Sequence, residues 1–149
     1  MRKLILMTAF YITSNLMFSQ KMDFKTLKLT IAQKAVIVKE DDNVIEYQLD
    51  KVRIYLIADE NANRMRLMAG VIEESKMSKE DLVKVLEANY DKALDAKYAL
   101  SNEVLWSVFT HPLRELSPEQ VVDALNQVRN LVNNYGTTYT STDLVFGGN

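Results

Sequence analysis

The stretch KYALSNEVLWSVFTHPLRELSPEQ, residues 97–120, decides the fold of this chain. Two runs that alternate apolar and polar residues flank the polar pair at 101–102, and this pattern is typical of a β-hairpin with a tight turn. Pro112 then stops the second strand, because proline has no N–H to donate to a strand ladder. The closing SPEQ, residues 117–120, has a serine N-cap, a first-turn proline and a capping-box glutamine, so it predicts the start of a helix.

The only tryptophan and the only histidine of the chain lie in this stretch. Trp106 shares a strand face with Val104 and Val108, since side chains two residues apart point the same way. It is predicted to be a core or sheet-face aromatic residue. His111 is interpreted as a surface residue that terminates the strand. With one histidine as the sole candidate base and no nucleophile elbow, a Ser-His triad is not expected.

Three more strands are expected upstream of the hairpin. Apolar residues alternate with polar ones over 45–49, over 52–56 and over 65–71, which is the period-2 pattern of half-buried strands. The connections between these runs are short, so the three strands are predicted to form an antiparallel meander. The charged run KEDDN, residues 39–43, is interpreted as a break in the chain before the first of them.

Apolar residues at spacings of three and four predict three helices: one over 24–35, one from the Ser78 N-cap, and one from 117 to a C-terminal cap at Gly136. Asn89 lies on the apolar stripe of the second helix, where a polar side chain must find hydrogen-bond partners. It is expected to tie down a neighbouring turn or strand end. The other members of that stripe are Leu82, Val85, Leu86 and Ala93.

The predicted order of elements is α-β-β-β-α-β-β-α, an α+β fold with one antiparallel sheet of about five strands flanked by helices. A length of 149 residues and a hydrophobic content of 48% suit one packed domain. We assign this single α+β domain to residues 21–136. The segment 137–149 has β propensity but no evident partner strand, so it is expected to be a flexible C-terminal tail or a weak edge strand.

The composition argues against several classes of site. A net charge of -2 with scattered positive residues argues against nucleic acid. The absence of cysteine and the single histidine argue against disulfides, thiolate chemistry and zinc. Asp59, Asn61 and Asn63 imitate the start of a calcium loop, but Arg64 and Gly70 stand where the loop requires Gly and Glu. No cofactor, metal ion or catalytic group is therefore expected.

Residues 1–20 have the charge pattern of a secretory signal peptide. Arg2 and Lys3 precede an apolar run over 4–11, and polar residues follow up to Gln20 without an acidic residue. The apolar run is too short for a stable membrane span. Cleavage near Gln20 leads us to expect a periplasmic or secreted protein. An amphipathic first helix and an uncleaved anchor are the alternatives for this segment.

The amphipathic stretch SKEDLVKVLEANYDKALDAKYAL, the hairpin KYALSNEVLWSVFTHPL and the helix start LSPEQ resemble type III secretion chaperone-like folds, and among them the YbjN-type family. The resemblance covers residues 23–136. It implies one antiparallel sheet with helices at its start, middle and end, a dimer that holds extended peptides along its sheet and helix surface, and no catalytic residues. Secretion chaperones are typically cytoplasmic, whereas this chain is expected to be exported, so the resemblance implies the fold rather than a literal effector-chaperone role.

The leading functional hypothesis is an exported, non-enzymatic binding or chaperone-like protein that forms a homodimer and holds a protein or peptide partner. An antiparallel sheet covered by few helices leaves apolar surface exposed, and such surface marks partner sites. Candidate contacts are large or adaptable side chains on predicted strands: Tyr55, Met68, Tyr98 and Trp106. The runner-up is a periplasmic carrier of a small apolar ligand, held between the sheet and the helix from Ser78. A hydrolase of unfamiliar type is the third hypothesis.

Overall fold

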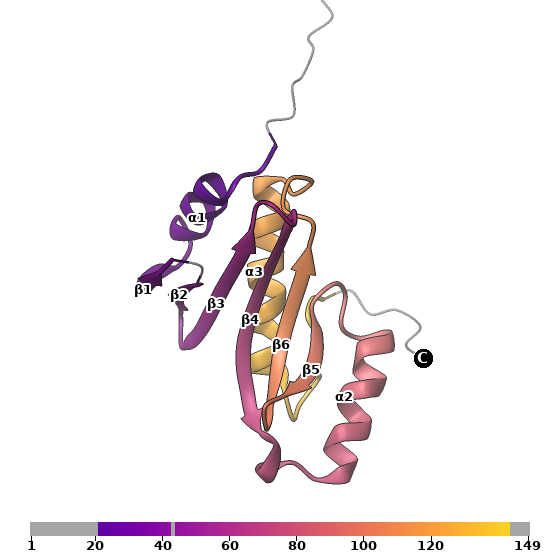
Figure 1. Ribbon diagram of the computed structural model, residues 1–149. Helices are drawn as coiled ribbons and strands as arrows, with labels where there is room; N and C mark the ends of the chain where they lie inside the picture. The colour runs from indigo at the N-terminus through magenta and orange to yellow at the C-terminus, as the bar shows by residue number, and fades with distance from the viewer. Residues whose placement is uncertain (1–20, 43, 144–149) are drawn as a thin grey trace, which may run out of the picture.

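An antiparallel sheet of six strands, in the order β1-β2-β3-β4-β6-β5, forms the body of the molecule (Figure 1). The computed structural model describes residues 21–42 and 44–143. The strands are β1 (Val36–Asp41), β2 (Val44–Leu49), β3 (Val52–Asp59), β4 (Arg64–Glu73), β5 (Lys97–Ser101) and β6 (Val104–His111). The helices are α1 (Phe24–Ala32), α2 (Lys79–Asp91) and α3 (Pro118–Asn134), with the short 3-10 turn η1 (Glu74–Lys76). This arrangement confirms the α+β class expected from the sequence.

The strand β1 differs from the sequence-based expectation. The first helix ends at Ala32 instead of continuing to residue 35, and the chain from Val36 pairs with β2, where Val36 lies opposite Gln48. β1 lies at the edge of the sheet and is largely exposed. Because neither of its faces is buried, nothing requires its residues to alternate between apolar and polar. The charged residues 39–41 therefore form the second half of this strand instead of breaking the chain, and the sheet has six strands rather than about five.

The two faces of the sheet are covered differently. α3 packs against β3, β4, β5 and β6 on one face, and α1 packs against α3 (Figure 1). The opposite face, which we call the open face, has no helix over it in the described part of the chain. The core side chains that the strands supply beneath α3 and α1 are Ile45, Tyr47, Leu49, Val52, Ile54, Leu56, Met65, Leu67, Ala69, Leu105 and Phe109.

The cap predicted from SPEQ fixes the start of α3. Ser117 Oγ accepts a hydrogen bond from the Gln120 backbone N–H at 3.2 Å, and Gln120 Oε1 accepts one from the Ser117 N–H at 2.8 Å. The two bonds satisfy donors that a helix start otherwise leaves unpaired. The helix ends at Asn134, slightly before the expected cap at Gly136, which has a left-handed φ of 76°. The side chains that α3 buries are Val121, Ala124, Leu125, Gln127, Val128 and Leu131.

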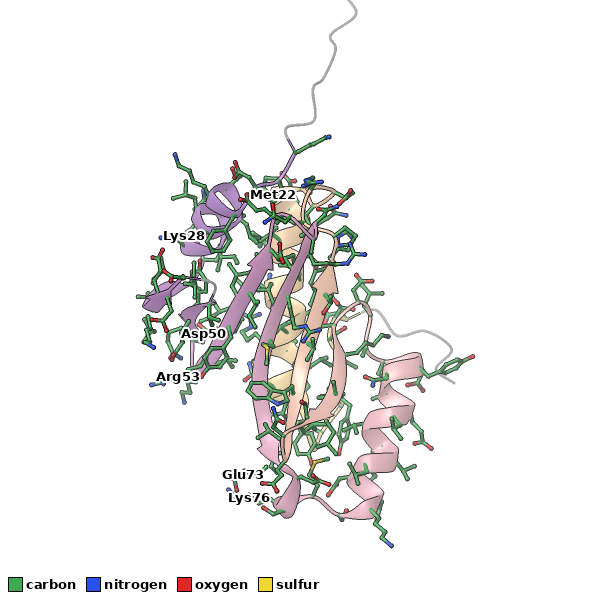
Figure 2. The ribbon with its side chains drawn as sticks, in the orientation of Figure 1. Met22, Lys28, Asp50, Arg53, Glu73 and Lys76 are labelled. Atoms are coloured by element: carbon green, nitrogen blue, oxygen red, sulfur yellow. The ribbon has the colours of Figure 1, made fainter. Side chains whose placement is uncertain are left out.

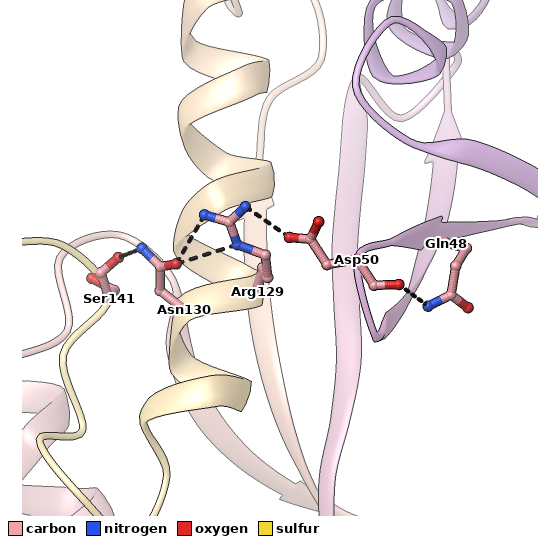
Figure 3. A network of polar contacts seen from close by, with 5 residues as sticks. All are labelled: Gln48, Asp50, Arg129, Asn130 and Ser141. Carbon is pink, nitrogen blue, oxygen red and sulfur yellow. Dashed lines mark hydrogen bonds and ion pairs between the residues drawn. The ribbon is translucent and has the colours of Figure 1, made fainter.

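A polar network joins α3 to two distant parts of the chain (Figure 3). Arg129 Nη1 lies 3.3 Å from Asp50 Oδ2 in the turn between β2 and β3, and Gln48 Nε2 donates to the Asp50 carbonyl at 2.8 Å. On the other side, Asn130 Nδ2 donates to the Ser141 carbonyl at 2.9 Å. Arg129 also donates to Asn130 Oδ1, from Nη2 at 3.2 Å. The C-terminal segment and the β2–β3 turn are thus held to the same helix.

The chain ends are described in part. The expected signal peptide, residues 1–20, lies outside the described residues, as do 144–149. Within the described part of the chain, no helix is long and apolar enough to cross a membrane. Residues 137–143, expected to begin a flexible tail, instead pack on the domain, since Tyr139 and Ser141 are buried. Backbone hydrogen bonds hold this segment to the rest of the domain. Such bonds leave no periodic pattern in the sequence, so the sequence does not predict them.

α2 lies beside the edge strand β5 instead of across the sheet (Figure 1). Its start is fixed by a capping box in which Ser78 Oγ accepts from the Asp81 N–H at 3.1 Å. Asn89 Nδ2 donates to the Tyr98 carbonyl at 2.9 Å, and Asn89 Oδ1 accepts from the Tyr98 N–H at 2.8 Å. This pair of bonds confirms that Asn89 ties down a strand, because its amide takes the place of a neighbouring strand along β5.

Candidate partner-binding surface

Three of the four candidate contacts meet on the open face. Tyr55 of β3 lies directly opposite Met68 of β4, and Trp106 of β6 lies opposite Gly70 of β4. The rings of Tyr55 and Trp106 meet edge to face, with centroids 6.3 Å apart and planes inclined by 72°. We call Tyr55, Met68 and Trp106 the aromatic patch. All three side chains are half-buried, so each presents apolar surface to the outside.

Two features hold Trp106 in the aromatic patch. A Cβ atom placed on Gly70 would lie 3.8 Å from Trp106 Cζ3, so the indole ring rests over the one residue of β4 that has no side chain. The Trp106 Nε1–H donates to the Ser101 carbonyl at 3.1 Å. The ring is thus fixed before any partner arrives, and a fixed aromatic side chain loses little conformational entropy on binding.

Tyr98 is not part of the aromatic patch. It points to the covered face, is only 5% exposed, and donates its hydroxyl to the Leu131 carbonyl of α3 at 2.7 Å. Its ring meets those of Tyr135 and Tyr139 edge to face, with centroids 6.4 and 6.3 Å away. Burial, the largest cause, raises the pKa of the Tyr98 phenol well above its ordinary value. The expectation that Tyr98 contacts a partner is therefore wrong, because the strand places it on the side that α3 covers.

Charged side chains surround the aromatic patch. Arg66 of β4 donates from Nε to Thr110 Oγ1 at 3.2 Å, and Arg53 at the start of β3 lies 3.0 Å from Glu46 of β2. Arg53 and Glu73 bound the sheet at the end nearest η1 (Figure 2). An apolar centre with a polar rim is the usual anatomy of a protein interface.

A second apolar surface runs along α2. Val83, Leu86 and Tyr90 recur at spacings of three and four and are 53%, 68% and 90% exposed. We call these residues the α2 stripe, and Leu100 of the neighbouring β5 is 44% exposed. Leu86 was expected to be buried with Val85, so that expectation is wrong. The reason is that α2 covers only the edge of the sheet and buries one narrow side, which contains Val85 and Ala88.

The structure offers little to the other two hypotheses. In the described part of the chain, α2 lies beside β5 and not over the sheet, so the two do not enclose the pocket that the carrier hypothesis requires. The cavity along α2, of about 340 Å³, is lined mainly by charged and polar side chains, including Lys84, Glu87 and Asp91. His111 at the end of β6 has Nδ1 2.8 Å from the Pro112 carbonyl and stacks on Phe109. Among the described residues, no group of three or more His, Asp or Glu side chains could hold a metal ion.

Comparison with known proteins identifies the fold. No family model matches the chain, and no curated protein matches it in sequence. A chain of the HopA1–SchA chaperone–effector complex is similar in structure, with a TM-score of 0.58 and 13% sequence identity over 75% of this chain and 91% of that chain. A chain of the ExsC–ExsE complex has a TM-score of 0.55 and 11% identity over 73% of this chain and 89% of that chain. The secretion-chaperone-like fold is confirmed.

Proposed function

We propose that this protein is an exported, non-enzymatic, chaperone-like protein that holds an extended segment of a partner protein on the open face, at the aromatic patch. The observation that carries the proposal is the contact between Tyr55 and Trp106 across a sheet face that no described helix covers. The similar solved structures include a chaperone bound to an effector, which supports a protein partner. Export rests on the charge order of residues 1–20, and an intact Met1 in protein recovered from its host would contradict it.

The aromatic patch suits a protein segment because of its residue types. Trp and Tyr are enriched among the few interface residues that dominate binding energy, and Met adapts its shape to different side chains. An extended segment laid over β3, β4 and β6 presents every second side chain to the patch. The polar rim, which includes Arg66, then satisfies polar groups of the segment at the margin.

The α2 stripe supports the dimer that we include in the proposal. Val83, Leu86 and Tyr90 form a continuous apolar side on a helix whose other exposed residues are mostly charged. A second copy of the same chain offers an identical stripe, and two such helices can bury each other's apolar sides about a two-fold axis. Because α2 lies at the β5 edge, this pairing leaves the aromatic patch free.

Trp106→Ala is expected to weaken partner binding by about 30-fold, equivalent to about 2 kcal/mol, because it removes the largest side chain of the patch. The experiment is a crosslinked pull-down of tagged protein from the envelope of its own host, read by mass spectrometry. Leu29→Ala is the matched control, since Leu29 is 56% exposed but lies on α1, on the covered side. A partner recovered with wild type and with the Leu29 variant, and lost with the Trp106 variant, is the expected result.

The proposal loses its site if the Trp106 variant retains the partner at the wild-type level. Circular dichroism must show that the variant is folded, because Trp106 also bonds to Ser101. Should it unfold, Met68→Lys replaces it: lysine keeps a long apolar stem but places a charge in the middle of the patch. Retention of the partner by a folded Met68 variant then rejects the patch as the binding surface.

Leu86→Glu is expected to convert the dimer into monomers, because it buries a carboxylate in the middle of the paired α2 stripes. Size-exclusion chromatography with light scattering measures the change, and the circular dichroism spectrum should stay unchanged since Leu86 is 68% exposed. Glu87→Gln, on the next residue of the same helix, is the control and should remain dimeric. A wild-type protein that is monomeric throughout a concentration series removes the dimer from the proposal.

A further inference from the structure

One edge of β6 has no neighbouring strand at its end. β6 continues to His111, but β5 begins at Lys97, which lies opposite Val108. The end of β6, residues 109–111, therefore pairs with β4 on one side only, where Met65 lies opposite His111. The gap is an interior step in the sheet and not one of its two outer edges.

The backbone of Thr110 faces this gap. In an antiparallel ladder, the N–H and C=O groups of successive residues point alternately to the two sides. Tyr98 directs both groups away from β6, toward Asn89, so Lys97 exchanges hydrogen bonds with Val108. Two residues on, Thr110 must point the same way as Val108. No described strand lies opposite Thr110 on this side, and no described turn or loop residue forms a backbone hydrogen bond with its N–H or carbonyl.

A buried side chain of α3 keeps the gap open. Gln127 is only 1% exposed, and its Oε1 accepts hydrogen bonds from the Asp95 N–H at 2.9 Å and the Ala96 N–H at 3.1 Å. The Leu94 N–H donates to Ser141 Oγ at 2.7 Å. If β5 extended further along β6, Asp95 would lie opposite Thr110 and its N–H would face β6, as the backbone of Lys97 does. Because Gln127 holds the Asp95 N–H instead, the chain before Lys97 turns away and the step persists.

A cavity of about 390 Å³ occupies the gap, between the loop before β5 and the first turns of α3. Phe109 and Leu116 supply apolar lining, and Asp95 and Asp123 supply two carboxylates. Neither carboxylate forms an ion pair with a described residue. The ammonium group of Lys97 is directed elsewhere, because its Nζ donates to the Asn89 carbonyl of α2 and to the Ala93 carbonyl just after this helix, at 2.7 Å each. Gln127 Nε2 donates to Asp123 Oδ2 at 2.7 Å and to Asp95 Oδ2 at 3.3 Å, but it carries no charge. The cavity thus combines a free strand edge with two carboxylates that form no ion pair with a described residue.

We propose that the Thr110 edge accepts a short extended segment of another polypeptide by strand addition, and that this segment carries lysine or arginine. The residue opposite Thr110 exchanges two backbone hydrogen bonds with it and points to the open face. Its two neighbours point inward, toward Asp95 and Asp123, so those positions take the basic side chains. This site is separate from the aromatic patch and does not depend on the function proposed above.

The test uses two acetylated, amidated pentapeptides, Val-Lys-Val-Lys-Val and Val-Glu-Val-Glu-Val. Each is added to the ¹⁵N-labelled protein in the form that its host produces. The lysine peptide is expected to shift the amide resonances of Phe109, Thr110 and His111 and to bind at least about 10-fold more tightly than the glutamate peptide. Salt at about 1 M should reduce this difference, because it screens the charges. Equal affinity of the two peptides, or shifts that avoid these three amides, overturns the proposal.

Thr110→Pro removes the N–H that faces the gap, and proline is tolerated where a strand edge is free. The variant is expected to bind the lysine peptide at least about 10-fold more weakly. Thr110→Val retains the N–H and removes only the hydroxyl that Arg66 contacts, so it should bind like wild type. A folded proline variant with wild-type affinity contradicts the proposal. If that variant unfolds, the two peptides tested on the unaltered protein provide the answer, and Leu29→Ala on α1 should leave the affinity unchanged.

Discussion

Tyr98→Ala should destabilise the folded domain by about 4 kcal/mol, as measured by urea denaturation. The substitution removes a ring that packs against Tyr135 and Tyr139 and leaves the Leu131 carbonyl without its hydroxyl donor. Small domains have a total stability of roughly 5–15 kcal/mol, so the variant should lie near the limit of folding. Tyr98→Phe, which keeps the ring, should lose only about 1 kcal/mol.

The control for this prediction is Leu29→Ala, because Leu29 is 56% exposed on α1 and lies outside both the aromatic patch and the α2 stripe. The free energy of unfolding of this control variant should change by no more than about 0.5 kcal/mol. If Tyr98→Ala instead keeps the wild-type midpoint and loses a binding partner, Tyr98 belongs to a partner surface and its placement in the core is wrong.

Gln127→Met should destabilise the domain by about 2–4 kcal/mol, because each unpaired N–H in a buried position costs about 1–3 kcal/mol. Methionine has nearly the same length and shape but cannot accept the hydrogen bonds of the Asp95 and Ala96 N–H groups. It also cannot donate to Asp123 Oδ2, which Gln127 Nε2 contacts at 2.7 Å. Urea denaturation at pH 7 measures the loss, and a midpoint equal to that of wild type contradicts the structural role of Gln127.

Gln127→Glu is the informative companion, because it keeps an acceptor oxygen but adds a charge beside Asp95 and Asp123. Repulsion between like charges raises the pKa of the introduced carboxyl in the folded protein above its value in the unfolded chain. The folded state then binds its proton more readily, so the stability relative to wild type is highest at low pH and falls as pH rises through the folded pKa. Denaturation at pH 4.5 and at pH 7 should therefore show a smaller deficit at pH 4.5.

The local elements of the fold follow from the sequence because local chemistry dictates them. The Ser117 and Ser78 capping boxes form as the residue types require, since the cap side chain and its partner are only three positions apart. The hairpin at 97–111 forms because alternation and a polar turn coincide. The role of Asn89 could be predicted because a polar side chain on an apolar helix stripe needs hydrogen-bond partners. The N–H and the carbonyl of Tyr98 are these partners.

The arrangement of these elements does not follow from the sequence in the same way. Tyr98 and Trp106 occupy adjacent strands with similar alternation, and only the packing of α3 decides which face is covered. Leu86 lies on the apolar side of its helix, so its periodicity predicts burial. The sequence does not show that α2 lies at the edge of the sheet, where only one narrow side of the helix is buried. All three residues of the aromatic patch were therefore among the four contacts predicted from the sequence, while the α2 stripe and the gap at Thr110 required the structure.

The two outer margins of the sheet have a consequence for behaviour in concentrated solution. Exposed strand margins promote sheet-to-sheet aggregation unless charges, irregularities or covering groups block them. Here Asn89 occupies the β5 margin, while β1 carries the charged residues 39–41 and a shift in register after Ile37. The molecule should therefore resist amyloid-like stacking at high concentration, and the gap at Thr110 spans only residues 109–111, too few to nucleate a second sheet.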